Sequence, residues 1–263
     1  MSVVSVPVTP LGQRLRSSRG STGARLRAAR ELVARPEALI DDLLESAAVV
    51  ARLGDPQTRF VPARAILRRD LSTIAHRERA PRTEDFAFWL AHCGRLVVAG
   101  HPLLECEPVD RELLAARAYA PSGPSQARRS GAVRVDLLLV NTADRTPVVA
   151  EVKIGRDGDA FLAVLQALTG LTHMAGPDQY AHMCQRYPAA HFTRREHPPP
   201  MDACVICVDT DWRTGQRGAL LHAAKDIACA VSASPRTAAL VRRVTLLAMA
   251  RRPGSVWEDA VRL

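Results

Sequence analysis

The spacing of apolar and polar residues along this chain predicts several strands in its second half. Residues 132–140 and 147–154 are rich in β-branched and aliphatic side chains, and the turn-forming sequence NTADRT separates them. The run ACVICVD at 203–209 is apolar almost throughout, which is typical of a strand buried on both faces. The sequence VRRVTLLAMA at 241–250 predicts a last strand.

Helical spacing predicts the elements between these strands. A first core helix is expected over 84–99, begun by Thr83 as N-cap, and later helices over 158–175 and 217–232. A short strand is expected over 102–108 and a loop over 119–131. The inward side chains of the first core helix should be Phe86, Trp89, Leu90 and Leu96. Together the elements predict an α/β fold with a mixed central sheet flanked by helices.

The chain before this core has a different character. Residues 1–20 are expected to be disordered, and helical pattern follows over 24–54 and over 63–77. We therefore divide the chain into a basic, partly disordered arm with a helical extension over 1–80 and a main domain over 81–263.

The two neighbouring strands can be aligned by simple arithmetic. In a symmetric hairpin, the residue numbers of any two opposed residues add up to the same value. A sum of 287 places the centre of the hairpin between Ala143 and Asp144, in the middle of the turn. Asp136 then lies opposite Glu151, with Cβ atoms about 4.5–5.5 Å apart, and Lys153 lies on the same face. The other face is apolar and should pack on the core: Val133, Val135, Leu137, Leu139, Val148, Ala150, Val152 and Ile154. We expect the face with the acids to be open to solvent.

Two carboxylates at this separation repel each other unless a cation lies between them. Hard oxygen ligands in such a pair suit Mg²⁺, with Mn²⁺ as a substitute. Lys153 is one of only two lysines, beside Lys225, in a chain rich in arginine, and its flexible amine could reach a phosphate or a water molecule. The alternative is a surface ion pair worth roughly 0–1 kcal/mol, which would not explain why two acids are opposed.

The motif made by these residues is similar to that of a known family. Val135-Asp136, fourteen further residues and then Glu151-Val152-Lys153 resemble the PD-(D/E)xK motif of the restriction-endonuclease-like superfamily, with Val135 in place of the proline. The resemblance implies an αβββαβ core over about residues 83–210. It also implies that Asp136, Glu151 and the Val152 carbonyl bind the metal, while Lys153 positions or activates the attacking water.

Two further residues have roles only by this resemblance. Gln166 matches a glutamine that many members place on the helix after the lysine, although it could equally be an exposed helix residue. Glu84 is the nearest candidate for an additional acid on the first core helix, and a simple helix-start acid is the alternative, with Glu105 and Glu107 competing for such a role. The implied activity is Mg²⁺-dependent hydrolysis of phosphodiester bonds in DNA, or in RNA, as a nuclease of DNA repair or of defence against foreign DNA.

The basic charge of the chain is concentrated near its N-terminus. The net charge is +9 and the pI about 9.9. Residues 1–35 hold seven arginines against Glu31, 7 − 1 = +6, which leaves only +3 for the rest. This segment is either a solvated tail or an arm that binds phosphates. Arg128, Arg129 and Arg134 precede the acids and are candidates for nucleic-acid contacts, with generic surface charge as the alternative.

Other classes of protein are disfavoured. No apolar run approaches the roughly 18 residues that span a bilayer, and the N-terminus lacks the pattern of a secretory signal, so we expect a cytoplasmic protein. The six cysteines are scattered and should be reduced. A zinc site over 173–207 is disfavoured because a CxxC within a strand directs its sulfurs to opposite faces.

Two alternatives to a nuclease stay open at this point. The chain could keep the fold but only bind nucleic acid or act as a scaffold in a larger complex, or its hairpin could merely mimic the motif. The acid, acid and lysine set is intact, which argues against the first alternative. One site per chain means that cutting both strands of a duplex needs a homodimer or two successive events.

Overall fold

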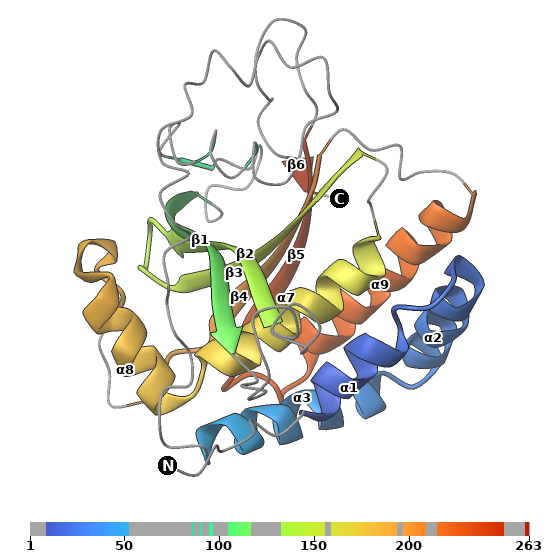
Figure 1. Ribbon diagram of the computed structural model, residues 1–263, viewed down its shortest axis with the longest axis horizontal. Coiled ribbons are helices and arrows are strands. Elements are labelled where there is room, and N and C mark those ends of the chain that lie inside the picture. Colours follow the sequence, from blue (N-terminus) through green and yellow to red (C-terminus); the bar gives the residue numbers. More distant parts are fainter. Residues whose placement is uncertain are drawn as a thin grey trace, which may run out of the picture.

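The computed structural model describes residues 9–52, 86, 90, 95–96, 105–116, 133–155, 159–193, 197–208, 215–249 and 261–262. Its elements follow an α/β order, with helices first and then strands joined by helices (Figure 1). Their bounds are α1 Pro10–Ser17, α2 Thr22–Ala34, α3 Pro36–Ala51, β1 Cys106–Ala116, β2 Val133–Asn141, β3 Pro147–Ile154, α7 Ala160–Met174, α8 Pro177–Arg186, the 3-10 helix η2 Pro188–Ala190, β4 Met201–Val208, α9 Gly215–Ala233, β5 Val241–Met249 and β6 Val261–Arg262.

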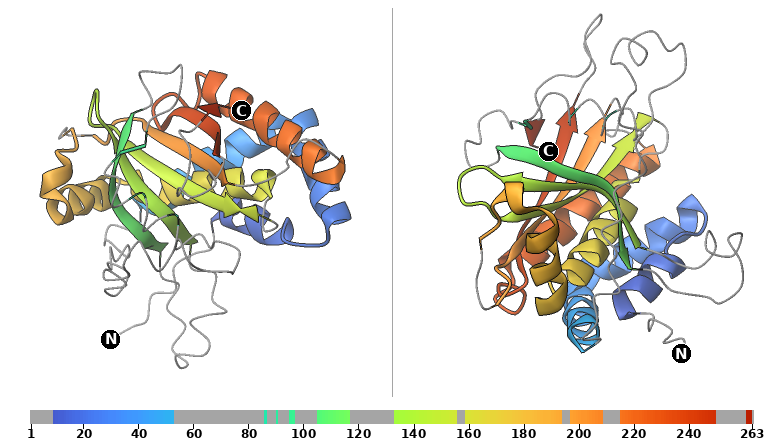
Figure 2. Two further views of the ribbon diagram at one scale, coloured as in Figure 1. Left: turned by 90° about the horizontal axis from the view of Figure 1, so that it is seen from above. Right: turned by 60° about the vertical axis from the view of Figure 1, so that its left-hand side comes forward.

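The strands form one mixed sheet in the order β1-β2-β3-β4-β5-β6. β1, β2 and β3 pair antiparallel, β3, β4 and β5 pair parallel, and the two-residue β6 pairs antiparallel with β5. The arrowheads of β3, β4 and β5 therefore point to the same edge of the sheet (Figure 2). The predicted α/β class, with a mixed sheet flanked by helices and helices at the N-terminus, is confirmed.

The register of the β2–β3 hairpin is the predicted one. Leu137 pairs with Ala150 and Val140 pairs with Pro147, and the residue numbers of each pair between these two also add up to 287. The turn is built as its sequence requires: the Asn141 side chain accepts a hydrogen bond from the Ala143 N–H at 2.9 Å, and the Asp144 side chain accepts one from the Thr146 N–H at 3.1 Å. Such side-chain acceptors fix where the turn lies and thereby fix the register.

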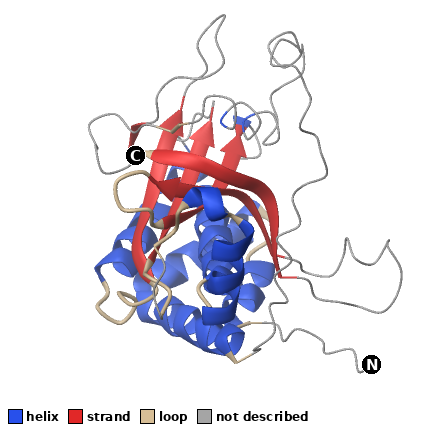
Figure 3. Cartoon of the chain, turned by 90° about the vertical axis from the view of Figure 1, so that its left-hand side faces the viewer, coloured by secondary structure: helices blue, strands red, loops and turns tan. Residues whose placement is uncertain are grey.

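Both faces of the sheet are covered, which contradicts the expected solvent-facing side. α7 packs on β2, β3 and β4, and α9 packs on β5, with α1–α3 stacked against these two helices (Figures 1 and 3). The helix-side core takes Leu138, Val140 and Val149 from the hairpin face that was expected to be wet. On the opposite face, Leu137, Leu139, Val148, Ala150, Val152 and Ile154 pack with Phe86, Leu90 and Leu96. Sequence pattern missed this because the helix-side face mixes its polar residues with apolar ones.

The N-terminal helices are part of the same core. Residues 10–17, expected to be disordered, form α1, with Leu11 and Leu15 buried one turn apart and the Thr9 hydroxyl accepting a hydrogen bond from the Gly12 N–H. α2 and α3 confirm the helical prediction for the following residues, and Pro36 starts the second of them. Arginine-rich composition suggested disorder, but the segment is held by its two buried leucines, by the ion pair of Arg14 with Asp42 and by the hydrogen bond from the Leu11 N–H to Ser46 Oγ.

The predictions for β1 and for the first core helix are confirmed only in part. The strand expected over 102–108 is β1, which is longer and begins at Cys106; polar residues along this edge strand concealed its length. Phe86 and Leu90 are helical and fully buried, but Leu96 forms a β-bridge with Cys106, so the first core helix does not extend through it.

All eight residues of β4 are buried, and β3, β4, α7, α9 and β5 lie within two residues of their predicted bounds. Thr83, Trp89 and residues 63–77 and 119–131 lie outside the described residues.

The sequence disfavoured a zinc site at the CxxC motif and a membrane-spanning helix, and both expectations can be compared with the described part of the chain. Cys106, Cys204 and Cys207 are buried, as expected, while Cys229 is exposed. Cys204 lies in the core on one face of the sheet and Cys207 in the core on the other, so the CxxC does separate its sulfurs. Within the described ranges, none of the helices combines the length and the apolar character needed to cross a bilayer.

Candidate metal and catalytic site

The two predicted acids meet where β2 and β3 cease to pair. The ladder between these strands runs as far as Leu137 and Ala150. Beyond it, the N–H of Val152 donates a hydrogen bond to Oδ2 of Asp136 at 2.9 Å. A side-chain carboxylate thus replaces the backbone acceptor that continued pairing would supply, which places Asp136 beside Glu151 at the edge where β3 ends.

The pleat of β2 is interrupted at the same residue. Val135 packs in the helix-side core, whereas Leu137, two residues later, packs in the core on the other face. Regular alternation would place both side chains on one face, and the sequence prediction for Val135 is wrong in this respect. Gly170 of α7 explains how Val135 fits: a Cβ at Gly170 would come within 2.5 Å of Val135 Cγ2. The missing side chain lets the helix approach β2 closely at Val135, the residue before Asp136.

Glu151 is a buried carboxylate with an unsatisfied oxygen. Its residue exposure is 1%. Oε2 accepts a hydrogen bond from Lys153 Nζ at 3.2 Å, but the buried Oε1 has no donor among the described residues. Burial, and then the neighbouring Asp136 carboxylate, raise the pKa of Glu151 well above its usual value, while Lys153 acts in the opposite direction. In the absence of a further cation, the folded chain therefore disfavours the charged form of Glu151, although Lys153 is its neighbour.

The chemistry of this arrangement is that of a cation ligand. Two carboxylates and an orphaned buried oxygen suit a hard divalent ion that keeps several water ligands, as Mg²⁺ does. No group of three or more His, Cys, Asp or Glu side chains within the described residues could hold a metal, so a closed structural site of the zinc type is not formed there. The third predicted ligand was the carbonyl of Val152. The side chain of Val152 is buried in the core on the face opposite α7, and its N–H donates a hydrogen bond to Asp136.

The other predicted site residues are only partly placed. Gln166 lies half-buried on α7, and within the described structure no hydrogen bond joins it to Asp136, Glu151 or Lys153. Arg134 lies in β2 next to the site in sequence, and its side chain is outside the described part. Glu84, Arg128 and Arg129 lie outside the described residues.

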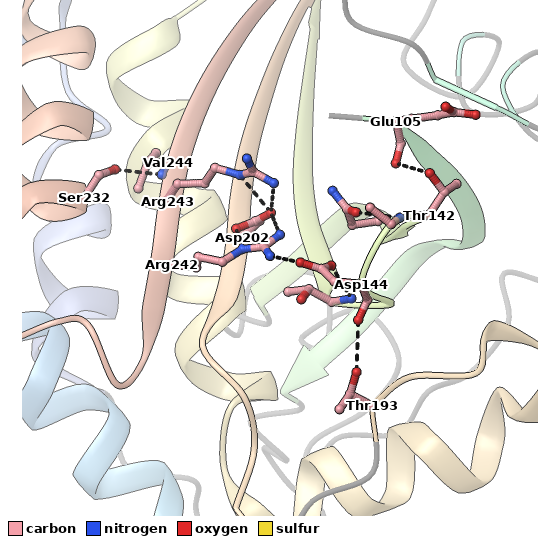
Figure 4. A network of polar contacts seen from close by, with 12 residues as sticks. Glu105, Thr142, Asp144, Thr193, Asp202, Ser232, Arg242, Arg243 and Val244 are labelled. Atoms are coloured by element: carbon pink, nitrogen blue, oxygen red, sulfur yellow. Dashed lines mark hydrogen bonds and ion pairs between the residues drawn. The ribbon is translucent and has the colours of Figure 1, made fainter. Parts of the chain in front are cut away.

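Sequence reasoning missed a second buried carboxylate, Asp202 of β4 (Figure 4). Its residue exposure is also 1%. Arg242 Nε donates to its Oδ1 at 2.7 Å, and Arg243 Nη2 donates to its Oδ2 at 2.9 Å. Arg242 also pairs with Asp144 in the hairpin turn. An acid in a strand buried on both faces, with an Arg-Arg pair beginning the next strand, was the signal that could have found it.

A second missed contact joins the N-terminal helices to this edge of the sheet. Asp159 caps α7 by accepting a hydrogen bond from the Leu162 N–H at 2.9 Å, and it forms an ion pair with Arg25 of α2 at 3.1 Å. Asp159 follows Lys153 by six residues in the sequence, so α2 is attached directly after the candidate site.

A scan against protein-family models and searches of curated proteins and of solved structures found no match to this chain. Interpretation of the site therefore depends on its own residues: Asp136, Glu151 and Lys153, brought together by a hairpin register that the sequence predicts.

Proposed function

We propose that this protein is a Mg²⁺-dependent nuclease that hydrolyses phosphodiester bonds of DNA, with Asp136, Glu151 and Lys153 as its catalytic group. The observation that carries the proposal is the state of Glu151: a fully buried carboxylate, beside a second carboxylate, with one oxygen that accepts no hydrogen bond from the described residues. An arrangement of this kind costs stability unless a ligand compensates for it.

Asp202 supplies the internal comparison. It is as buried as Glu151, but it accepts hydrogen bonds from two arginines through both of its oxygens. That is how this chain buries a carboxylate for structural reasons. Glu151 instead has one lysine contact and an acidic neighbour, which favours a role in binding a cation over a role in holding the fold.

The chain's own residues would divide the work as follows. Asp136, held by the Val152 N–H, presents its carboxylate from a fixed position, and Glu151 presents Oε1 from β3. When bound between them, a magnesium ion would supply positive charge to the phosphate oxygens. Lys153 Nζ, 3.2 Å from Glu151, would donate hydrogen bonds to the attacking water or to a phosphate oxygen and so stabilise developing charge.

Cleavage assays test this proposal directly. Linear, circular, single-stranded and branched DNA would be incubated with the full chain in Mg²⁺, in Mn²⁺ or in EDTA, together with RNA. We expect cutting with either metal and none with EDTA. Lys153→Met should reduce the rate about a hundredfold or more, whereas Lys225→Met, which removes the only other lysine, should not.

Two outcomes would contradict the proposal. If Lys153→Met and Asp136→Asn cut as fast as the wild type, these residues are not the catalytic group. If the wild type binds DNA but cuts no substrate with any metal, the chain is a binding or scaffold module of the same architecture.

A further inference from the structure

The outer surface of α1 and α2 carries a group of arginines that have no acidic partner among the described residues. Five of the seven arginines between residues 9 and 35 are exposed, and their side chains form no hydrogen bond or ion pair with another described residue: Arg16, Arg19, Arg27, Arg30 and Arg35. The other two are used internally, Arg14 by Asp42 and Arg25 by Asp159. Glu31 is the only acid in the same stretch. The chain thus separates its structural arginines from a set that faces solvent.

The α2 members of this set have fixed positions. Ala29 and Leu32 are buried against the rest of the protein, and Arg27 and Arg30 project from the opposite side of the helix. Residues three apart on a helix have Cβ atoms about 5–6 Å apart. Arg27 Nη1 lies 3.9 Å from the position of a Cβ at Gly23, so this guanidinium extends back over the first turn of α2. A folded helix, and not a mobile tail, presents these charges.

The same helix is attached close to the candidate site. Arg25 pairs with Asp159, which follows Lys153 by six residues. Six residues span at most about 21 Å, which corresponds to roughly six base pairs of duplex DNA at about 3.4 Å each. The neighbouring helix α3 has the opposite charge, with four acids and no arginine or lysine between Pro36 and Ala51. A bound polyanion would therefore extend over α2 and not over α3.

We infer that Arg27 and Arg30 of α2, together with the arginines at the end of α1, bind the phosphate backbone of duplex DNA beside the catalytic edge. The inference rests on the proposed function for the identity of the polymer. Charge complementarity carries it: guanidinium groups at fixed spacing suit phosphates, which they contact through two parallel hydrogen bonds. Such contacts position a substrate without reading its sequence.

Binding measured without cleavage tests the inference. Fluorescence anisotropy with a labelled 30-base-pair duplex in EDTA would compare the wild type with Arg27→Gln/Arg30→Gln, with Arg27→Lys/Arg30→Lys, and with Arg52→Gln/Arg186→Gln. The last variant removes two exposed arginines from the ends of α3 and α8, so its net charge matches that of the first. Thermal unfolding would verify that all variants are folded.

We expect the Arg27→Gln/Arg30→Gln variant to bind about tenfold more weakly, with a slope of log K against log[salt] that is shallower by about 2, since each phosphate contact contributes about 0.9. The lysine variant should keep the slope, and the Arg52/Arg186 variant should keep both affinity and slope. Equal losses in both glutamine variants, no loss in either, or displacement of the duplex by polyglutamate as effective as by unlabelled DNA would overturn the inference.

These outcomes are separable from those of the proposed function. If Arg27→Gln/Arg30→Gln binds like the wild type while the wild type cuts DNA in Mg²⁺, only the surface assignment fails. If the variant loses affinity but the wild type cuts nothing, the surface stands and the nuclease proposal fails.

Discussion

Asp136 accepts a hydrogen bond from the backbone N–H of Val152 at 2.9 Å, at the point where β2 and β3 stop pairing. The carboxylate completes the hydrogen bonding of β3 and is at the same time oriented by it. Glu151, the residue before Val152, is thereby held next to Asp136. One backbone contact thus fixes the geometry of two acids.

The buried state of Glu151 leads to an unusual prediction for Glu151→Gln. The environment of Glu151 disfavours its charged form even with Lys153 present. Replacing the carboxylate by an uncharged amide should therefore raise the free energy of unfolding by about 1–2 kcal/mol at neutral pH in EDTA. Affinity for Mn²⁺ should fall at least tenfold. Chemical unfolding and calorimetric titration measure the two quantities.

Asp202→Asn is the matched control for that experiment. Its carboxylate is equally buried, but two arginines depend on it. Loss of one partner of a buried ion pair costs about 3–5 kcal/mol, and the partial exposure of these arginines places the expected loss near the lower end. Mn²⁺ affinity should not change. If Glu151→Gln destabilises the protein as much as Asp202→Asn does, Glu151 has a structural role and the comparison between them fails.

Gly170→Ala should destabilise the fold beneath the site. The added Cβ would meet Val135 Cγ2 at 2.5 Å and Val149 Cγ1 at 3.2 Å, so α7 and β2 must separate. Overpacking of this kind costs about 1–3 kcal/mol, more than the roughly 1 kcal/mol gained in helix propensity. Gly23→Ala on α2 is the control: the nearest atom is 3.9 Å away, so stability should be unchanged or rise. Equal effects on the melting temperature would refute this account of the close approach.

His173 should make stability sensitive to mild acid. Burial in α7 lowers its pKa from 6.5 to about 4. Between these values the unfolded chain binds the proton more readily than the folded chain, so stability is complete above pH 6.5 and falls as the pH decreases toward 4. The contribution amounts to about 3 kcal/mol. His173→Gln should flatten the dependence of the free energy of unfolding on pH between 4 and 6.5, as measured by chemical unfolding at a series of pH values. If the variant loses stability over this range as steeply as the wild type does, His173 is not the cause.

The hairpin shows what local pattern can predict. Asn141 and Asp144 are side chains that specify a turn, and their positions set the register that opposes Asp136 to Glu151. Pattern also predicted that Cys204 and Cys207 face opposite ways. Both inferences need only the period of a strand and the chemistry of a turn.

What pattern could not predict depends on distant parts of the chain. The acids were expected in solvent because nothing local shows that α7 covers their face, and Glu151 is buried by residues far from it in sequence. The interruption of the pleat at Asp136 depends on Gly170, 34 residues later. Asp202 and Arg242, which are joined by a hydrogen bond between their charged side chains, are 40 residues apart in the sequence. Such pairings are fixed by tertiary packing, which the strand period does not encode.

The central claim is that Asp136 and Glu151 share a divalent cation. Anomalous diffraction at the manganese edge, from crystals of the full chain soaked in MnCl₂, tests it most directly. We predict one peak within about 2.5 Å of an oxygen of each carboxylate, absent from crystals of Glu151→Gln. Bound manganese elsewhere with none between these two side chains, or a peak that persists in Glu151→Gln, would contradict the claim.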